Sequence, residues 1–123
     1  MEIKTINVDF SVCKVEDFSL VNFDDEFVFV GKTDEEKSLV CNSQFVPKNC
    51  IECESGWKAF RIQGVLDFSL VGILAKISSL LANNGIPIYA ISTFNTDYIL
   101  VKTENYAKSL DILVENGYKI LQQ

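Results

Sequence analysis

The spacing of hydrophobic and polar residues in the first half of the chain is typical of β-strands. Four apolar residues alternate with polar ones near the N-terminus: Ile6, Val8, Phe10 and Val12. A period of two indicates a strand that buries one face. The apolar runs at 27–32 and 38–41 predict two more strands, and the polar residues 33–36 between them predict a turn, or one helical turn capped by Thr33. Residues 16–23 are consistent with either a strand or a loop packed on the core.

The second half of the chain shows the strand period and the helix period in turn. Residues 57–63 alternate, with Phe60 and Ile62 on one face, and predict a strand. A helix is then predicted from apolar residues at helical spacing: Ile73, Leu74, Ile77, Leu80 and Leu81. A second helix is predicted from a similar stripe: Ala107, Leu110, Leu113 and Val114. The Asn and Gly residues at 83–85 and 116–117 are typical helix ends.

Three further strands complete the predicted order of elements. The apolar residues 86–91 predict a buried strand, 98–102 predict the next strand and 118–121 predict the last. The order β-α-β-β-α-β is that of the ferredoxin-like fold, in which two helices cover one face of a four-stranded antiparallel sheet. The sequence therefore predicts an α+β protein, with a ferredoxin-like domain at 54–123 and a strand-rich first half at 1–53. The strands of that first half are expected to add a layer or to extend the same sheet.

Composition and charge limit the classes of function. Hydrophobic residues make up 48% of the chain and charged residues 23%, which is the balance of a folded globular protein. The formal net charge is −6, and the 11 basic residues are scattered. Nucleic acids and anionic membrane surfaces attract clustered Lys and Arg, so we expect neither as a partner. The charged N-terminus is unlike a signal peptide, and no apolar run approaches the roughly 18 residues of a membrane span, so we expect a cytoplasmic protein.

The chain has four cysteines and no histidine. Cys50 and Cys53 form a C-x-x-C pair, which is consistent with half of a zinc site or with a redox pair. Because no histidine is present, a zinc site needs Cys13 and Cys41 to converge on this pair. We favour the simpler interpretation of reduced thiols, with no metal and no cofactor. The lack of histidine also removes the commonest general base, so we expect no catalytic residues and no enzymatic activity.

Two loops are the candidates for ligand binding. Residues 65–72 lead into the first helix, and the backbone N–H groups at a helix start favour a ligand carboxylate. Gly72 suits the close approach of a ligand there, although it also suits tight packing of the helix on a strand. The second loop, 92–97, is polar and longer than a two-residue hairpin turn. In a β-α-β-β order both loops lie at the same end of the sheet, which brings Asp97 near the carboxylate seat as a partner for an ammonium group.

The stretch 57–102, above all LDFSLVGILAKISSLLANNGIPIYAISTFNTDYILVK, resembles the regulatory ACT domains of aspartokinases. A helix-start loop, a helix followed by an (N)G-I-x-I strand and an I-S-T loop recur in those domains in that order. The segment KTDEEKSLVC and the GW after the cysteines are similar to short bacterial two-ACT proteins. Those proteins are in turn similar to the ACT repeats of animal cytosolic arginine sensors. The resemblance covers nearly the whole chain, with its specific residues at 57–102.

This resemblance implies a βαββαβ ACT sandwich and an amino-acid effector bound at an interface between ACT units. The first half is then a degenerate ACT-like unit, because it lacks a pair of amphipathic helices. The residues that the resemblance places at the ligand are Asp67, Phe68, Ser69, Val71 and Gly72, with Ile91, Ser92, Thr93, Asn95, Thr96 and Asp97. We expect an amino-acid-binding regulatory module that forms a homodimer. The alternative is a protein–protein interaction module that dimerises through its sheets without a ligand.

Overall fold

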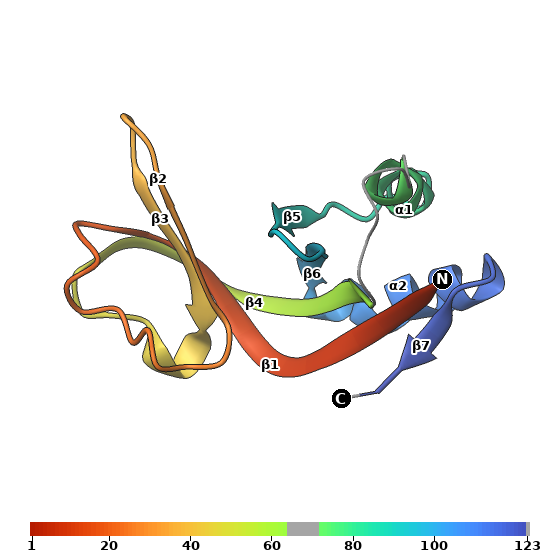
Figure 1. Cartoon of the computed structure of the whole chain (residues 1–123), viewed down its shortest axis with the longest axis horizontal. Helices are drawn as coiled ribbons and strands as arrows, with labels where there is room; N and C mark the ends of the chain where they lie inside the picture. The colour runs from red at the N-terminus through yellow and green to blue at the C-terminus, as the bar shows by residue number, and fades with distance from the viewer. Residues whose placement is uncertain (64–71, 123) are drawn as a thin grey trace. The chain divides into compact units, whose positions relative to one another are not determined.

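The computed structural model describes residues 1–63 and 72–122, and the chain divides into two compact units. The first unit consists of Met1–Asn7 and Lys58–Gln123, and the second consists of Val8–Trp57. Two long strands, β1 (Glu2–Val15) and β4 (Cys50–Gln63), contribute residues to both units (Figure 1). Among the described residues, no helix has the length and apolar character needed to cross a membrane.

The first unit is a mixed α/β fold with two helices on a largely antiparallel sheet. After β4 the chain forms α1 (Ile73–Ala82), β5 (Tyr89–Ser92), β6 (Asp97–Lys102), the 3-10 helix η2 (Thr103–Asn105), α2 (Tyr106–Glu115) and β7 (Lys119–Leu121). The strands lie in the order β5-β6-β4-β1-β7, with β5 antiparallel to β6 and β7 parallel to β1. The first residues of the chain therefore supply a strand between β4 and β7.

The core of this unit lies between the two helices and one face of the sheet. Phe60 and Ile62 are fully buried there, which confirms the predicted face of β4. They belong to one cluster with buried residues from the other strands and both helices: Ile3, Ile77, Leu81, Ile86, Ile99, Val101, Ile112, Leu113 and Tyr118. The predicted apolar stripe of α1 is confirmed as well, since Ile77 and Leu81 are buried and its other three members pack against this cluster.

The buried face of α2 agrees with the predicted stripe only in part: Leu113 is buried and Leu110 packs against the core, whereas the other two members are exposed. The helix turns Ser109, Ile112 and Leu113 toward the core, whereas Ala107 is exposed and Val114 is 55% exposed. The apolar stripe missed Ser109 because its side chain is polar. The Ser109 hydroxyl donates to the backbone carbonyl four residues earlier at 2.7 Å, so its burial leaves no unpaired polar atom.

The apolar stretch 86–91 is not the buried strand that the sequence predicts. Strand β5 begins only at Tyr89 and lies at the edge of the sheet. Its residues alternate between half-buried and exposed. An edge strand packs against one neighbour only, and the apolar character of this stretch does not reveal how many neighbours it has.

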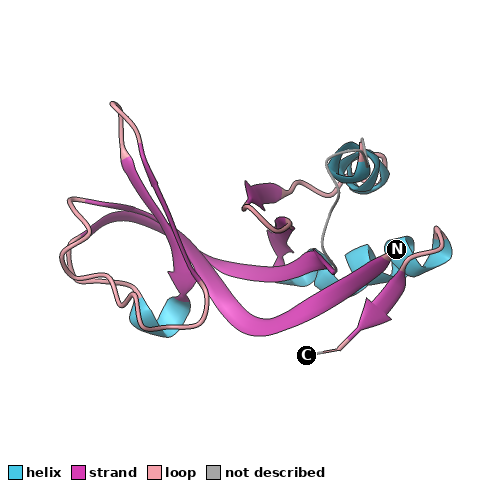
Figure 2. Cartoon of the chain, in the orientation of Figure 1, coloured by secondary structure: helices cyan, strands magenta, loops and turns pink. Residues whose placement is uncertain are grey.

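The second unit consists of strands and loops. Residues 8–57, all of which the structure describes, contain β2 (Val28–Lys32), β3 (Lys37–Asn42) and the 3-10 helix η1 (Ser43–Phe45), but no α-helix (Figure 2). The strand order is β2-β3-β1-β4, with β3 antiparallel to both of its neighbours. Residues 16–23 form turns and irregular loop, so the loop interpretation of that segment is confirmed.

The two units share one type of β-hairpin. In the second unit Lys32 pairs with Lys37, and in the first unit Ser92 pairs with Asp97, so each hairpin is closed by a four-residue connection. In each, the backbone N–H of the first connecting residue, a threonine, donates to the carbonyl of the fourth at 2.9 Å. The strands that follow, β3 and β6, are both six residues long, have the same order of half-buried and buried positions and lead into a 3-10 helix.

Candidate functional site

Part of the predicted ligand site lies outside the described residues: Asp67, Phe68, Ser69 and Val71. Gly72 is described, and it is the residue immediately before α1 rather than a member of its first turn. Its backbone is left-handed, with φ 81° and ψ 11°, which is strained for any residue with a side chain. A Cβ built at Gly72 would meet no atom of the described residues within 4 Å. The left-handed backbone conformation is by itself a sufficient reason for glycine at this position.

The described residues provide no side-chain cap at the start of α1, and the first turn of the helix contains no acidic residue. The backbone N–H of Lys76 donates to the carbonyl of Gly72 at 2.9 Å. The N–H groups before Lys76 have no acceptor within the helix, and they carry the partial positive charge of the helix start. Gly72, Ile73 and Lys76 line one side of a cavity of about 400 Å³. The ammonium group of Lys76 adds to the positive charge there, so this end of α1 favours an anionic group.

The second predicted loop is a compact turn. Because Ser92 and Asp97 are paired strand residues, the connection is limited to residues 93–96. The Thr93 hydroxyl and the Thr93 backbone N–H both donate to the carbonyl of Thr96, each at 2.9 Å. Ile91 is half-buried, whereas Ser92, Thr93 and Asn95 are exposed. The turn thus has a fixed backbone and presents several polar side chains to solvent.

Asp97 is held by its strand partner. The Ser92 hydroxyl donates to Oδ1 of Asp97 at 2.5 Å, and Asp97 is half-buried. A carboxylate has about four acceptor positions on its two oxygens. The pair therefore fixes the direction of the Asp97 side chain and still leaves acceptor capacity for a cationic group.

Thr96 connects the turn to β4. It is 8% exposed, and its hydroxyl donates to the backbone carbonyl of Ile62 at 2.6 Å. Ile62 is the second-last residue of β4, and the chain then enters the segment 64–71. The side chain of Thr96 is thus committed to holding the turn beside the end of β4.

Two residues near these features were missed by the sequence reasoning. Phe94, at the turn between β5 and β6, is 92% exposed, so its aromatic ring is accessible at the surface. Lys76 lies one helical turn after Gly72 and lines the cavity. The signal for Lys76 was its spacing from the helix start, and the signal for Phe94 was a bulky apolar residue among the polar residues 92–97.

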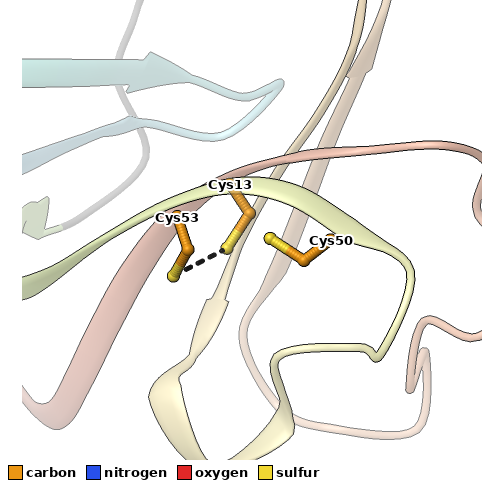
Figure 3. Close-up of side chains that lie close together, drawn as sticks. All are labelled: Cys13, Cys50 and Cys53. Carbon is orange, nitrogen blue, oxygen red and sulfur yellow. Dashed lines mark hydrogen bonds between the residues drawn. The ribbon is translucent and has the colours of Figure 1, made fainter.

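The second unit brings several thiols together. The sulfur atoms of Cys13, Cys50 and Cys53 all lie within 4.8 Å of one another, and no disulfide joins the cysteines (Figure 3). Burial raises the pKa of the Cys13 thiol, and its hydrogen bond with Cys53 raises it further. Burial also raises the pKa of Cys41, to about 11. These two thiols are therefore neutral near pH 7 in the metal-free protein.

The first unit as described is a small α/β module, with two helices on one face of a sheet and a polar turn anchored beside the end of its central strand β4. The sequence profile of the ACT domain family matches residues 52–115, which is more than half of the chain. The chain belongs to the ACT domain family. ACT domains are regulatory modules that bind small-molecule ligands and often oligomerise, which points to a regulatory role here as well.

Three solved structures show how far the likeness extends. A protein from Agobacterium tumefaciens is 28% identical, with a TM-score of 0.88 over 99% of this chain and 92% of that chain. A Vibrio cholerae protein of unknown function, described as a possible transport protein, is 21% identical, with a TM-score of 0.70 over 93% of this chain and 88% of that chain. The regulatory subunit of aspartate kinase from Thermus thermophilus is 11% identical, with a TM-score of 0.63 over 94% of this chain and 96% of that chain. The last two likenesses concern the fold alone.

Proposed function

We propose that this protein is a cytoplasmic sensor that binds an amino acid where the segment 65–72 and the turn between β5 and β6 come together. Backbone N–H groups near the start of α1 hold the ligand carboxylate, and Asp97 holds its ammonium group. The proposed ligand-facing residues are Asp67, Phe68, Ser69, Val71, Gly72, Ile91, Ser92, Thr93, Asn95, Thr96 and Asp97. The protein acts by binding and has no catalytic step of its own.

The observation that carries this proposal is the hydrogen bond between Thr96 and β4. The Thr96 hydroxyl donates to the carbonyl of Ile62 at 2.6 Å, which fixes the turn beside the strand end that leads toward α1. The first turn of α1, which contains no acidic residue, supplies positive charge, and Asp97 supplies negative charge. Opposite charges of this kind suit a zwitterion, since each ligand charge gains a charge-assisted hydrogen bond.

We further propose that β4 to β7 form a βαββαβ ACT unit and that the strands of the second unit are a partial ACT unit without helices. The shared hairpin and the strand order β2-β3-β1-β4 support this interpretation. The ligand site is then completed by a second ACT unit in a homodimer. Phe94, which is 92% exposed beside Asn95, supplies aromatic surface for that contact.

The test is thermal unfolding of the purified, ligand-free full chain with each of the twenty amino acids. A true ligand at 100 times its dissociation constant adds about 2.7 kcal/mol to the free energy of unfolding, which is a shift of several degrees for a domain of this size. A chain that responds to none of them would contradict the sensor function.

Two matched variants locate the site. Asp97→Asn keeps the shape of the side chain and removes its charge, so the affinity for the responding amino acid should fall at least about tenfold, since hydrogen bonds to charged groups contribute about 1.5–3 kcal/mol. Asp34→Asn makes the same change in the corresponding turn of the second unit and should leave the affinity unchanged. Equal affinities of the wild type and Asp97→Asn would place the ammonium seat elsewhere.

A further inference from the structure

The three clustered thiols come from two paired strands. Cys13 lies on β1, while Cys50 and Cys53 lie on β4, which pairs with β1. The Sγ atoms of Cys13 and Cys53 are 3.7 Å apart, and the Cys50 Sγ lies within 4.8 Å of both (Figure 3). Cys13 is buried, Cys50 is half-buried and Cys53 is exposed, so the cluster is open to solvent on one side.

A turn at the start of β4 explains how Cys50 joins the other two thiols. Residues three apart on a straight strand point to opposite faces, which would separate Cys50 from Cys53. The backbone N–H of Cys50 instead donates to the carbonyl of Pro47 at 3.1 Å. The backbone carbonyl of Asn49 accepts from the backbone N–H of Glu16, the residue after β1, also at 3.1 Å. The Cys50 thiol donates to the carbonyl of Glu52 at 3.0 Å. Cys50 thus sits at the end of a turn, where the strand alternation does not yet apply.

The cluster lies on the face of the second unit that corresponds to the helix-covered face of the first. Leu39 and Cys41 on β3 hold the same positions as Ile99 and Val101 on β6, which pack against α1 and α2. Cys13 packs with Leu39 and Cys41 in a cluster of four buried residues. In place of helices, that cluster is covered by half-buried loop residues and by Cys50. A face that is covered by loop residues and not by helices is one where a metal or a disulfide can add stability.

We propose that Cys13, Cys50 and Cys53 bind one Zn²⁺ as thiolates, with water as the fourth ligand, and that this metal stabilises the second unit in place of a helical layer. Three Zn–S bonds form, and the three thiol protons are released to solvent. Tetrahedral zinc with Zn–S bonds of about 2.3 Å separates its sulfur atoms by about 3.8 Å. The Cys13–Cys53 separation of 3.7 Å is close to this value. The Cys50 sulfur, which lies within 4.8 Å of both, would exchange its hydrogen bond to the Glu52 carbonyl for the bond to zinc.

The same thiols fit a disulfide less well. A disulfide holds its two sulfur atoms about 2.05 Å apart, so Cys13 and Cys53 would have to move together by well over an ångström. The bond would also leave Cys50 outside the chemistry, and its formation consumes an oxidant. Zinc, in contrast, uses all three thiols and requires no change of oxidation state.

Cys41 provides the matched control. It is a buried thiol in the same core cluster, but it does not belong to the group of three with mutually close sulfur atoms. Cys41→Ser therefore removes a thiol of the same unit without removing a proposed ligand. Cys53→Ser removes the exposed ligand and leaves the buried core intact, so that this variant folds.

The experiment titrates the reduced, metal-free full chain with Co²⁺ and follows the thiolate-to-cobalt charge-transfer absorption. We expect one equivalent to bind, Zn²⁺ to displace it, and Zn²⁺ to raise the thermal midpoint of the wild type and of Cys41→Ser. Cys53→Ser should bind Co²⁺ at least about tenfold more weakly and should lose the thermal shift with Zn²⁺.

Three outcomes would overturn the proposal. The first is a reduced wild type without charge-transfer absorption at any Co²⁺ concentration. The second is a loss of binding in Cys41→Ser as large as that in Cys53→Ser, which would give Cys41 the role of a ligand. The third is a Cys13–Cys53 disulfide, found by mass spectrometry, in a protein that fails to bind Co²⁺ after reduction. None of these outcomes depends on amino-acid binding in the first unit.

Discussion

The two hairpins of this chain have the same connection and register, but different elements pack on their buried faces. In the first unit the buried face of β6 packs under α1 and α2, within a cluster that includes residues from both helices. In the second unit the corresponding face of β3 packs under loop residues such as Phe18 and Val21. The comparison shows that a hairpin of this type specifies its own turn and register, while the layer above it determines how large a core it joins.

The two hairpins also differ in the fourth residue of the turn. Thr96 is buried and donates its hydroxyl to β4, whereas Glu36 in the same position of the second unit is exposed. The backbone bond that closes the turn is the same in both, from Thr33 to Glu36 and from Thr93 to Thr96. The first unit's turn is therefore anchored to the neighbouring strand, whereas the hydrogen bonds of the other turn, within the described part of the chain, are local ones to Thr33.

The largest expected effect on stability comes from truncating the buried side chain at the third position of β6 and of β3, which is Ile99 in the first unit and Leu39 in the second. Ile99→Ala removes a fully buried side chain from the helix-covered core and should lower the free energy of unfolding by about 3–5 kcal/mol. Leu39→Ala, at the corresponding position, should cost only about 2–3 kcal/mol, because the loop above it can move into the space. Urea unfolding followed by circular dichroism measures both. A larger loss for Leu39→Ala would show that the loop cover is as rigid as the helices.

Strand β4 and helix α1 were predictable because each has one apolar face that packs into the core. Alternation in β4 and the stripe of α1 report directly on burial, and both predictions hold at Phe60 and Ile77. The face of α2 was not predictable in this way, since Ser109 is buried through a hydrogen bond that sequence spacing does not reveal. The edge position of β5 also escaped prediction, because it depends on which strands pair.

The sequence predicted that a polar turn follows β5, but it did not predict the hydrogen bonds that hold that turn in place. A polar turn after β5 is visible in the sequence, and Asp97 and Ser92 were both named as ligand-facing residues. Their pairing across the two strands and the bond from Thr96 to Ile62 depend on register, which apolar spacing does not fix at a turn. The sequence raised the convergence of both Cys13 and Cys41 on Cys50 and Cys53 only as a requirement for zinc. The structure brings Cys13, and not Cys41, into the group of mutually close sulfur atoms, because pairing of β1 with β4 is a long-range contact that the sequence does not reveal.

A smaller effect is expected from the anchor of the first unit's turn. Thr96→Val keeps the shape of the side chain but leaves the carbonyl of Ile62 without its hydroxyl donor, which should cost about 1–3 kcal/mol in urea unfolding. Thr96→Ser retains the hydroxyl and should recover most of that loss. Glu36→Ala, at the corresponding position of the other hairpin, should change stability by less than about 0.5 kcal/mol. Equal costs for Thr96→Val and Glu36→Ala would mean that the anchor contributes nothing.

The smallest expected effect concerns the loop that covers the second unit. Hydrogen bonds from the hydroxyl and backbone N–H of Ser19, and one from Asn49, lower the pKa of Asp17 below its usual value of 3.8. A lowered pKa in the folded state means that the ionised carboxylate adds stability above about pH 4 and that this stability is lost as the pH falls through the folded-state pKa. Asp17→Asn should therefore flatten the decline of the thermal midpoint below about pH 4, with a modest change near pH 7.

Ser19→Ala tests the stated cause of that effect, because Ser19 supplies the hydroxyl bond that lowers the pKa most. This variant should flatten the same acid limb, and the double variant should flatten it no further than Asp17→Asn does, since both changes remove one interaction. An acid limb of the same steepness in the wild type and in Asp17→Asn would show that other carboxylates govern acid unfolding. Asp17 would then position the loop through the geometry of its bonds to Ser19 and Asn49, without any contribution from its charge.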